Sequence, residues 1–263
     1  MKKIACFILL LFASACKKEV GVAIYYTDNN IVAHKGAWAD GHCPPNSVAA
    51  LKKAIEMNCA GSEFDVWLTK DDSLIINHDP TYAGKNVENN TYSVLAKTRL
   101  ANGEMLPTLR KFLYAGSGQN QTKLFLEIKS LTYKEETANK IADRIADAVN
   151  EMQMQDHVIY TSFHFSALKE IHRRFPDAQT QFLGGIYSPD IIKSAGISGI
   201  NYDIDSFYHH TDWLPSAKKD SLVLAAWTVN DKFQFIWLLE NKFNYVVTDE
   251  PGSFFRVLEQ TRK

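Results

Sequence analysis

Short apolar runs rich in β-forming residues alternate with longer helical runs along this chain, from residue 31 to its carboxyl terminus. Some of the short runs are apolar throughout, as over residues 222–227, which is typical of parallel strands buried on both faces. Strands are predicted at 31–34, 61–67, 123–128, 156–162, 179–184, 198–202, 221–227 and 243–248, with a short extra strand at 74–77. Helices are predicted at 47–58, 107–115, 134–150, 165–174, 189–195, 206–218, 231–241 and 252–261.

Eight strand–helix repeats over about 230 residues predict a TIM (β/α)8 barrel, which is an α/β fold. A doubly wound parallel sheet is the alternative, because it is built from the same βαβ repeats. The longest irregular stretch covers residues 78–106 and is rich in Asn, Thr and Gly. In a barrel, this stretch is expected to form a loop or a small subdomain over the top face.

The first sixteen residues have the pattern of an export signal. Lys2 and Lys3 precede a mostly apolar stretch at 4–11, and small residues stand directly before Cys16. The apolar stretch is shorter than the roughly 20 residues that span a bilayer, so a signal peptide is predicted at 1–16 rather than a membrane helix. The small residues before Cys16 resemble a bacterial lipobox, which implies a lipid anchor on that cysteine. Cleavage by an ordinary signal peptidase is the alternative.

This pattern divides the chain into a signal peptide at 1–16, a short tether at 17–29 and one barrel domain at 30–263. We expect an exported protein, in the periplasm or held in the cell envelope as a lipoprotein, that meets the membrane only through its anchor. The formal net charge is −1, from 29 basic and 30 acidic side chains, with no long cationic run. This charge pattern argues against nucleic acid as a partner.

Two cysteines, Cys43 and Cys59, lie within the predicted barrel domain. They flank the helix predicted at 47–58, which rises about 1.5 Å per residue and holds them farther apart than a disulfide allows. Both are therefore predicted to be free or packed thiols.

Two carboxylates stand two residues apart in the strand predicted at 61–67. Glu63 and Asp65 point to the same face, because side chains alternate along a strand. Like charges this close repel unless a cation intervenes, and a hard divalent ion such as Mg²⁺ or Ca²⁺ prefers oxygen ligands. The pair predicts a divalent-cation site; a surface strand with two solvated carboxylates is the alternative.

Glu127 and Lys129 repeat this spacing in the strand predicted at 123–128. Glu127 would complete a cage of three carboxylates, and Lys129 would neutralise the cage or contact a phosphate oxygen. A purely structural Glu–Lys ion pair is the alternative.

Two histidines directly follow apolar strand runs and stand beside charged neighbours. His34 precedes Lys35, and His78 precedes Asp79. Imidazole is well suited to proton transfer near neutral pH, so one histidine would deprotonate an attacking oxygen and the other would protonate the leaving oxygen. Hydrogen-bonded core histidines are the alternative. Asp79 would either orient His78 or cap the loop that follows.

Taken in order, these motifs resemble those of the glycerophosphodiester phosphodiesterase family. That family carries His-Arg-Gly, Pro-Glu-Asn-Thr, Glu-x-Asp-Val, His-Asp, Glu-Ile-Lys, Trp-Thr-Val-Asn and Thr-Asp. The corresponding segments here are 34–36, 44–47, 63–66, 78–79, 127–129, 227–230 and 248–249. Each motif is weak alone, but seven in the family's order, from about residue 31 to the carboxyl terminus, are specific.

The resemblance implies a TIM barrel that uses a divalent cation, Mg²⁺ or Ca²⁺, to hydrolyse glycerophosphodiesters to glycerol 3-phosphate and an alcohol in phospholipid degradation. The metal ligands implied are Glu63, Asp65 and Glu127, the acid and base are His34 and His78, and the substrate contacts are Lys35, Lys129 and Trp227. A core aromatic role is the alternative for Trp227. Asn230 and Asp249 are equally explained as helix caps, and for Asp249, which shortly precedes Pro251, a cap is favoured.

The chain departs from the family pattern at two positions. Lys35 stands where the family usually has Arg, and an ammonium cannot hold a phosphate with two parallel bonds. Pro45 stands where the family usually has Glu, so any help from that carboxylate to the metal or the first loop is lost. Asn46 is retained, either to cap the first helix or to contact the active site.

Two other functions are weighed against this one. A related barrel phospholipase, such as a phosphatidylinositol-specific phospholipase C or a sphingomyelinase D, would act on intact phospholipid and would need an apolar rim. The polar stretch at 80–104 favours soluble, deacylated substrates instead. A lipoprotein that binds glycerophosphodiesters without hydrolysing them is disfavoured by the complete histidine pair.

Overall fold

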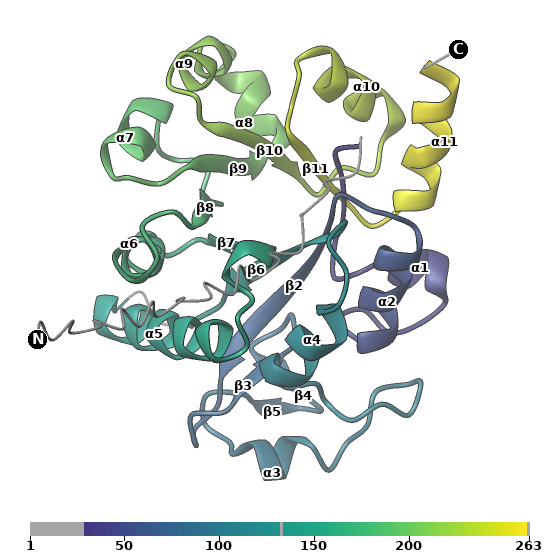
Figure 1. Cartoon of the computed structure of the whole chain (residues 1–263), viewed down its shortest axis with the longest axis vertical. Helices are drawn as coiled ribbons and strands as arrows, with labels where there is room; N and C mark the ends of the chain where they lie inside the picture. Colours follow the sequence, from purple (N-terminus) through teal and green to yellow (C-terminus); the bar gives the residue numbers. More distant parts are fainter. Residues whose placement is uncertain (1–28, 132–133, 262–263) are drawn as a thin grey trace, which may run out of the picture.

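The computed structural model describes residues 29–131 and 134–261, and it contains a closed barrel of eight parallel strands (Figure 1). The strands are β1 (Ile31–Ala33), β2 (Gly61–Leu68), β6 (Lys123–Ile128), β7 (Val158–Ser162), β8 (Gln179–Phe182), β9 (Gly199–Asp203), β10 (Val223–Trp227) and β11 (Tyr245–Thr248). The barrel closes because β1 pairs with both β2 and β11. The TIM barrel prediction is confirmed, and closure rules out the doubly wound sheet. The predicted signal peptide, Cys16 and all of the predicted tether except residue 29 lie outside the described residues.

The strands are surrounded by helices that follow them along the chain (Figure 1). The helices are α1 (Trp38–Gly41), α2 (Val48–Glu56), α4 (Leu109–Gly116), α5 (Glu135–Glu151), α6 (Phe165–Arg174), α7 (Pro189–Ser194), α8 (Ile204–His209), α9 (Trp213–Lys219), α10 (Lys232–Glu240) and α11 (Pro251–Thr261), with a short 3₁₀ turn at Gln155–His157. Among these helices of the described chain, none is both long and apolar enough to cross a membrane.

The single helix predicted at 206–218 is wrong, because this segment forms α8 and α9 with a break between them. Pro215 explains the break. A proline in the interior of a long helix would remove a backbone hydrogen bond, whereas the first turn of a helix tolerates it. In the structure Pro215 lies in the first turn of α9.

The stretch predicted to be irregular forms a small subdomain beside the barrel (Figure 1). It contains β4 (Thr81–Tyr82) paired with β5 (Lys85–Asn86), and the short helix α3 (Tyr92–Leu95). The strand before it, β3 (Leu74–Ile76), runs antiparallel to β2. A separate apolar cluster holds this region together, formed by Trp67, Ile75, Val87, Leu95 and Leu106. Since residue 78 follows β3 directly, the subdomain fixes where that histidine lies relative to the barrel.

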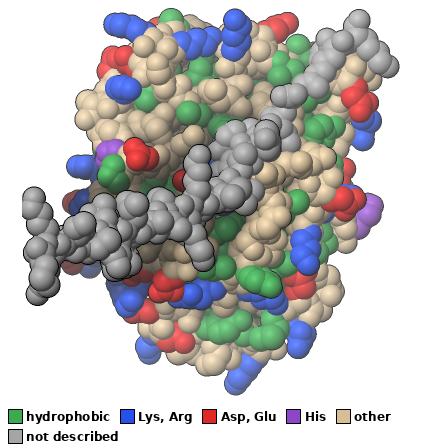
Figure 2. Space-filling view, viewed as in Figure 1, with side chains coloured by type: hydrophobic (Ala, Val, Ile, Leu, Met, Phe, Trp, Pro, Cys, Tyr) green, Lys and Arg blue, Asp and Glu red, His purple; other side chains and the backbone are tan. Residues whose placement is uncertain are grey.

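The main core lies between the strands and the surrounding helices, and a second apolar layer fills the barrel interior. That inner layer consists of Val32, Phe125, Ile159 and Val247. It supports from below the polar residues at the carboxyl ends of the strands. On the face drawn in Figure 2, basic and acidic side chains are interspersed rather than gathered into one patch of a single sign. Cys43 and Cys59 are free thiols, as predicted.

Candidate active site

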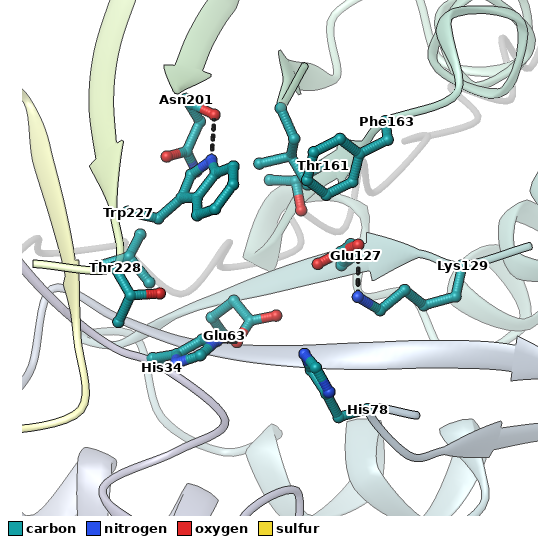
Figure 3. Close-up of a pocket in the computed structure, with 12 residues that line it drawn as sticks. His34, Glu63, His78, Glu127, Lys129, Thr161, Phe163, Asn201, Trp227 and Thr228 are labelled. Carbon is teal, nitrogen blue, oxygen red and sulfur yellow. Dashed lines mark hydrogen bonds and ion pairs between the residues drawn. The ribbon is translucent and has the colours of Figure 1, made fainter. Parts of the chain in front are cut away.

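The candidate active site is a pocket at the carboxyl ends of the barrel strands (Figure 3). Parallel strands bring their carboxyl ends to one face of a barrel, so residues far apart in sequence meet there. The pocket is lined by His34, Glu63, His78, Glu127, Lys129, Thr161, Phe163, Leu183, Asn201, Trp227, Thr228 and Val247. Six of the eight site residues predicted from the sequence are in this lining. Of the other two, Asp65 contacts Lys129 directly beneath the pocket, whereas the side chain of Lys35 does not line it.

Three carboxylates form a compact, buried cluster beside this pocket. Glu63, Asp65 and Glu127 each place a carboxylate oxygen within 4.8 Å of the others. The cluster follows from strand register, because Asp65 and Glu127 are direct partners across the β2–β6 pair. The Lys129 ammonium lies 3.0 Å from Asp65 Oδ1 and 2.8 Å from Glu127 Oε1. One ammonium is too little to neutralise three carboxylates when all of them are ionised.

The cluster still has unused acceptor atoms. Glu63 Oε1, Asp65 Oδ1 and Glu127 Oε1 are buried and accept no well-aligned hydrogen bond from any residue that the structure describes, although the last two are ion-paired to Lys129. Buried carboxylate oxygens are costly without partners, and hard oxygen atoms in this number are what a divalent cation binds. The three residues therefore fit a divalent cation.

Burial and mutual repulsion set the proton affinities of the cluster. Burial, with the charges of Asp65 and Glu127, raises the pKa of Glu63 well above its usual range. Burial and Asp65 likewise raise the pKa of Glu127 to about 8. Burial also acts on Asp65, but Lys129 and His78 outweigh it and lower the pKa of that carboxyl. Glu63 and Glu127 thus both hold a proton more tightly than an ordinary carboxyl group does.

We expect the metal-free protein to lose stability between about pH 5 and about pH 8. Glu127 has a pKa of about 8 in the folded protein, whereas the unperturbed value is 4.5. Between these two pH values the folded state binds more protons than the unfolded state, so the free energy of unfolding falls as the pH rises. Thermal unfolding in EDTA at both pH values measures the effect. Glu127→Gln, which cannot ionise, should reduce the difference, and a cation at high pH should restore stability. If the melting temperature of the Glu127→Gln variant fell by as much as that of the wild type or more, Glu127 would not be the group that causes the pH dependence.

His34 is held by a carboxylate from the last barrel strand. Its Nδ1 atom lies 2.9 Å from Asp249 Oδ1, and its Nε2 atom is 4.0 Å from Glu63 Oε2. Burial would raise the pKa of Asp249, but hydrogen bonds from His34 and Asn230 outweigh it and hold that pKa far below its usual range. An ionised carboxylate only accepts hydrogen bonds, so the Nδ1–H group of His34 donates to Asp249 and Nε2 is the ring nitrogen that faces the site.

The favoured interpretation of Asp249 as a helix cap is therefore wrong. Its Oδ2 atom accepts a hydrogen bond from Asn230 Nδ2 at 2.9 Å, and Oδ1 also accepts one from Trp38 Nε1 at 3.3 Å. Asn230 does not cap a helix either, because its Oδ1 accepts from the Asp249 backbone N–H and Asp231 caps α10. The sequence did carry a signal, since Asp249 directly follows an apolar strand just as His34 does.

Asp249→Asn is expected to lower kcat by about 10²-fold with a smaller effect on KM, because the amide can no longer fix the His34 tautomer. The pH profile of kcat should also shift, which a purely structural defect would not cause. Asp231→Asn is a matched control, since Asp231 follows Asn230, the hydrogen-bond partner of Asp249, and the variant keeps a good helix cap without contacting His34. If both variants lost kcat equally, Asp249 would only support the structure of the loops after β10 and β11.

His78 approaches the pocket from the subdomain. Its Nδ1 atom lies 2.8 Å from Asp79 Oδ1, so Asp79 does orient this histidine. The rings of His78 and His34 are 6.4 Å apart, centre to centre. The His78 backbone carbonyl accepts a hydrogen bond from Trp67 Nε1 at 3.3 Å. Two imidazoles, each paired with its own carboxylate, thus share one pocket with the acidic cluster (Figure 3).

Two residues of the first loop support the carboxylates from behind. Asn46, in a left-handed conformation with φ +58°, donates to Asp65 Oδ2 at 2.8 Å and accepts from the Asp65 backbone N–H at 3.2 Å. Ser47 caps α2, so Asn46 contacts the active site rather than capping the helix. Lys35, with φ +55°, donates its backbone N–H to Glu63 Oε2 at 2.8 Å. The positive φ values turn these groups toward the cluster.

Pro45, the second departure from the family pattern, is exposed and lies outside the pocket. The first loop still has a carboxylate, because Glu104 from the subdomain accepts hydrogen bonds from the backbone N–H groups of Val48 and Ala49. Those groups lie at the amino end of α2, where a negative charge is stabilising. The substitution therefore leaves the acidic cluster intact.

Trp227 forms a wall of the pocket on the side away from the histidines (Figure 3). Its Nε1 atom donates to the Asn201 backbone carbonyl at 2.7 Å, and its ring packs edge-on against Phe163 at 5.6 Å. Thr161, Phe163 and Asn201 also line the pocket, although the sequence analysis did not select them. Thr161 and Asn201 carried a usable signal, as polar residues within apolar strands.

Comparison with known proteins gives one consistent family. Residues 34–253 match the glycerophosphoryl diester phosphodiesterase family. A glycerophosphodiester phosphodiesterase from Caldanaerobacter subterraneus is 24% identical over 249 residues, covering 88% of this chain and 98% of the relative. The crystal structure of a glycerophosphodiester phosphodiesterase from Parabacteroides distasonis has a TM-score of 0.86 and 30% identity, and the match covers 89% of this chain and 98% of that one.

A phosphodiesterase from Oleispira antarctica, solved in complex with the product sn-glycerol-3-phosphate, has the same fold. Its TM-score is 0.76 at 19% identity, over 88% of this chain and 97% of that one. The family match spans both histidines, the acidic cluster and Asp249. Fold, site and comparisons agree that the chain is an enzyme and belongs to the glycerophosphoryl diester phosphodiesterase family.

Proposed function

We propose that the protein hydrolyses glycerophosphodiesters to glycerol 3-phosphate and an alcohol, with a divalent cation, Mg²⁺ or Ca²⁺, held by Glu63, Asp65 and Glu127. The observation that carries the proposal is the cluster of three buried carboxylates with oxygens within 4.8 Å of one another and a single ammonium beside them, next to two carboxylate-paired histidines in one pocket. The sn-glycerol-3-phosphate bound to the Oleispira antarctica phosphodiesterase supports this choice of product. Glycerophosphodiesters arise when phospholipids lose their acyl chains, so the reaction belongs to phospholipid degradation.

The chain's own residues supply positioning and proton transfer. A bound cation would neutralise phosphate charge and lower the pKa of a coordinated hydroxyl. Lys129, beside the cluster, adds a positive charge for the phosphate oxygens. One histidine takes the proton of the attacking oxygen, and the other gives a proton to the oxygen of the departing alcohol. Asp249 and Asp79 hold the two imidazoles in orientation. For Lys35, the backbone contact with Glu63 supports a role in placing a metal ligand, and phosphate contact remains a prediction.

A second candidate function rests on exposed apolar side chains that follow the carboxyl ends of the barrel strands. Leu131, Phe163, Ile186 and Phe233 follow β6, β7, β8 and β10 and are exposed, Ile186 by 72% and Phe233 by 69%. An apolar rim of this kind suits a substrate that keeps an acyl chain, so an intact phospholipid or lysophospholipid is the alternative substrate. A protein that only binds glycerophosphodiesters would need neither histidine–carboxylate pair.

A substrate panel separates these functions. Glycerophosphocholine, glycerophosphoethanolamine, lysophosphatidylcholine and phosphatidylcholine are compared at equal concentration, with Mg²⁺, with Ca²⁺ and with EDTA. We expect cation-dependent release of glycerol 3-phosphate from the first two. Faster cleavage of the acylated substrates would favour the second function, and tight binding without turnover would favour a binding protein.

We further propose that the protein is exported and held in the cell envelope by a lipid on Cys16. The small residues before Cys16 and the apolar stretch at 4–11 support this location. Expressed in a bacterium, the natural protein should sediment with membranes, and Cys16→Ser should be mostly soluble or unprocessed. Cys6→Ser, within the same segment, is the control and should leave the distribution unchanged. Membrane association that survives Cys16→Ser would contradict the anchor.

A further inference from the structure

The inner faces of three neighbouring strands carry polar residues on the pocket side opposite the histidines. Thr161 on β7 and Asn201 on β9 line the pocket, and Gln181 on β8 is the direct partner of Thr161 in the strand register. Gln181 shares its face with the pocket residue Leu183, because side chains two apart on a strand point the same way. Figure 3 shows Thr161, Asn201, Trp227 and Phe163 together, across the pocket from His34 and His78.

Two of these polar side chains are buried and have polar atoms that lack a partner among the described residues. Gln181 is fully buried, and neither its Oε1 nor its Nε2 atom has a hydrogen bond within the described part of the chain. Asn201 is only 2% exposed, and its Oδ1 atom also lacks a partner there. Thr161 Oγ1 has one long bond, 3.5 Å to the Leu126 carbonyl. Buried amides without partners are destabilising, so their presence beside a pocket indicates a ligand that completes their bonds.

The surrounding chain is shaped to hold these amides in place. Gly199 is the register partner of Gln181, and a Cβ atom at Gly199 would lie 3.3 Å from Gln181 Cγ and 2.8 Å from Val223 Cβ. Glycine therefore leaves the space that the longer side chain occupies. The Trp227 indole N–H donates a hydrogen bond to the Asn201 backbone carbonyl, so it does not occupy the side-chain amide of Asn201.

We propose that Asn201 and Thr161, with Gln181 beside them, form a subsite for the terminal hydroxyl of the substrate's glycerol group; this rests on the proposed function. Neutral amides both donate and accept, which matches a hydroxyl. The pocket residues from β7 to β10 in the described chain carry no carboxylate, so their amide and hydroxyl groups suit a neutral hydroxyl better than a primary ammonium group. Trp227, Phe163 and Leu183 offer apolar contact for the glycerol carbons. The terminal hydroxyl is the glycerol group that lies farthest from the phosphate. The wall formed by Thr161 and Asn201 lies across the pocket from the histidines, where the phosphate would react, so it is placed to contact that hydroxyl.

The test compares glycerophosphocholine with an analogue that lacks only the terminal hydroxyl, propane-1,2-diol phosphocholine, on the cation-loaded full chain. The hydroxyl next to the phosphoester, which can act as nucleophile, is present in both. We expect kcat/KM to be at least about tenfold higher for glycerophosphocholine, the size of one good hydrogen bond lost against buried groups. Asn201→Leu should remove this preference by slowing only glycerophosphocholine, and Gln181→Leu should reduce it.

Tyr160→Phe is the matched control. Tyr160 also has a buried hydroxyl without a partner in the described chain, and it lies on β7 beside Thr161, but its side chain packs in the core outside the barrel. Loss of the Tyr160 hydroxyl should leave the preference for glycerophosphocholine over the analogue unchanged. The melting temperature gives a second readout, because leucine in place of an unpaired amide should keep or raise the stability of Gln181→Leu and Asn201→Leu. A clear fall would indicate a structural role and overturn the proposal.

The inference fails if wild-type protein turns over both substrates equally, or if Asn201→Leu slows both by the same factor. Failure of the proposed function looks different, because wild-type protein would then turn over neither substrate. In that case calorimetry with sn-glycerol 3-phosphate and its 1-deoxy analogue makes the same comparison through binding. A preference for glycerol 3-phosphate that Asn201→Leu abolishes supports the subsite, and equal or absent binding of both overturns it.

Discussion

Replacement of His34 by alanine is expected to lower kcat for glycerophosphocholine by about 10³-fold and to change KM little. The loss follows from the geometry, because His34 Nδ1 is tied to Asp249 and Nε2 faces the site beside Glu63. Removing the imidazole removes proton transfer but leaves the carboxylates that would hold the cation. Steady-state rates of glycerol 3-phosphate release measure the effect, and His78→Ala should give a loss of the same kind.

His209→Ala is the control for this experiment, since His209 is an exposed residue at the end of α8 that bonds to the backbone of its own helix. It should keep wild-type kcat. If His34→Ala kept more than a tenth of the wild-type kcat, His34 would not be an essential proton-transfer group, and the reaction would have to rely on the cation, Lys129 and His78.

Glu63→Gln is expected to weaken Mg²⁺ or Ca²⁺ binding by about 100-fold or more, since even the residues that merely support metal ligands contribute 10–100-fold in affinity. Glutamine keeps the shape of the side chain but removes a charge from a cluster whose oxygens lie within 4.8 Å of one another. The same change also removes repulsion, so the variant should be at least as stable as wild type without metal. Calorimetric titration with each cation measures the affinity.

Glu104→Gln is the matched control for Glu63→Gln, because Glu104 binds backbone N–H groups at the start of α2 and lies outside the cluster. It should leave cation affinity unchanged. Unaltered affinity in Glu63→Gln would show that the cluster is not the metal site, even if that variant were inactive.

The barrel could be predicted from the sequence because its strands are buried on both faces and read as apolar runs. The acidic cluster could be predicted for the same reason. Glu63 and Asp65 interrupt one such run two residues apart, and Glu127 interrupts the next barrel strand two residues before Lys129. Helix boundaries were less certain, and Pro215 shows why: one residue divides a continuous helical pattern into two helices.

Asp249 and Asn201 show how far a local sequence signal falls short of identifying a residue's partner in the fold. Asp249 precedes a proline that begins a helix, so local rules favour a cap, while its real partner His34 is 215 residues away. Asn201 looks like an ordinary polar position in a strand until closure of the barrel turns it into a pocket wall. Lys35 differs again, because its contribution to the site comes from a backbone N–H set by a positive φ.

The most direct test of the central claim follows the reaction of purified protein with glycerophosphocholine by phosphorus NMR, first with EDTA and then with Mg²⁺ or Ca²⁺ added. We predict that the diester signal is replaced by that of glycerol 3-phosphate only after the cation is added, and that this conversion is lost in His34→Ala. No conversion by a folded protein that demonstrably binds the cation would contradict the claim that this site is a glycerophosphodiester hydrolase.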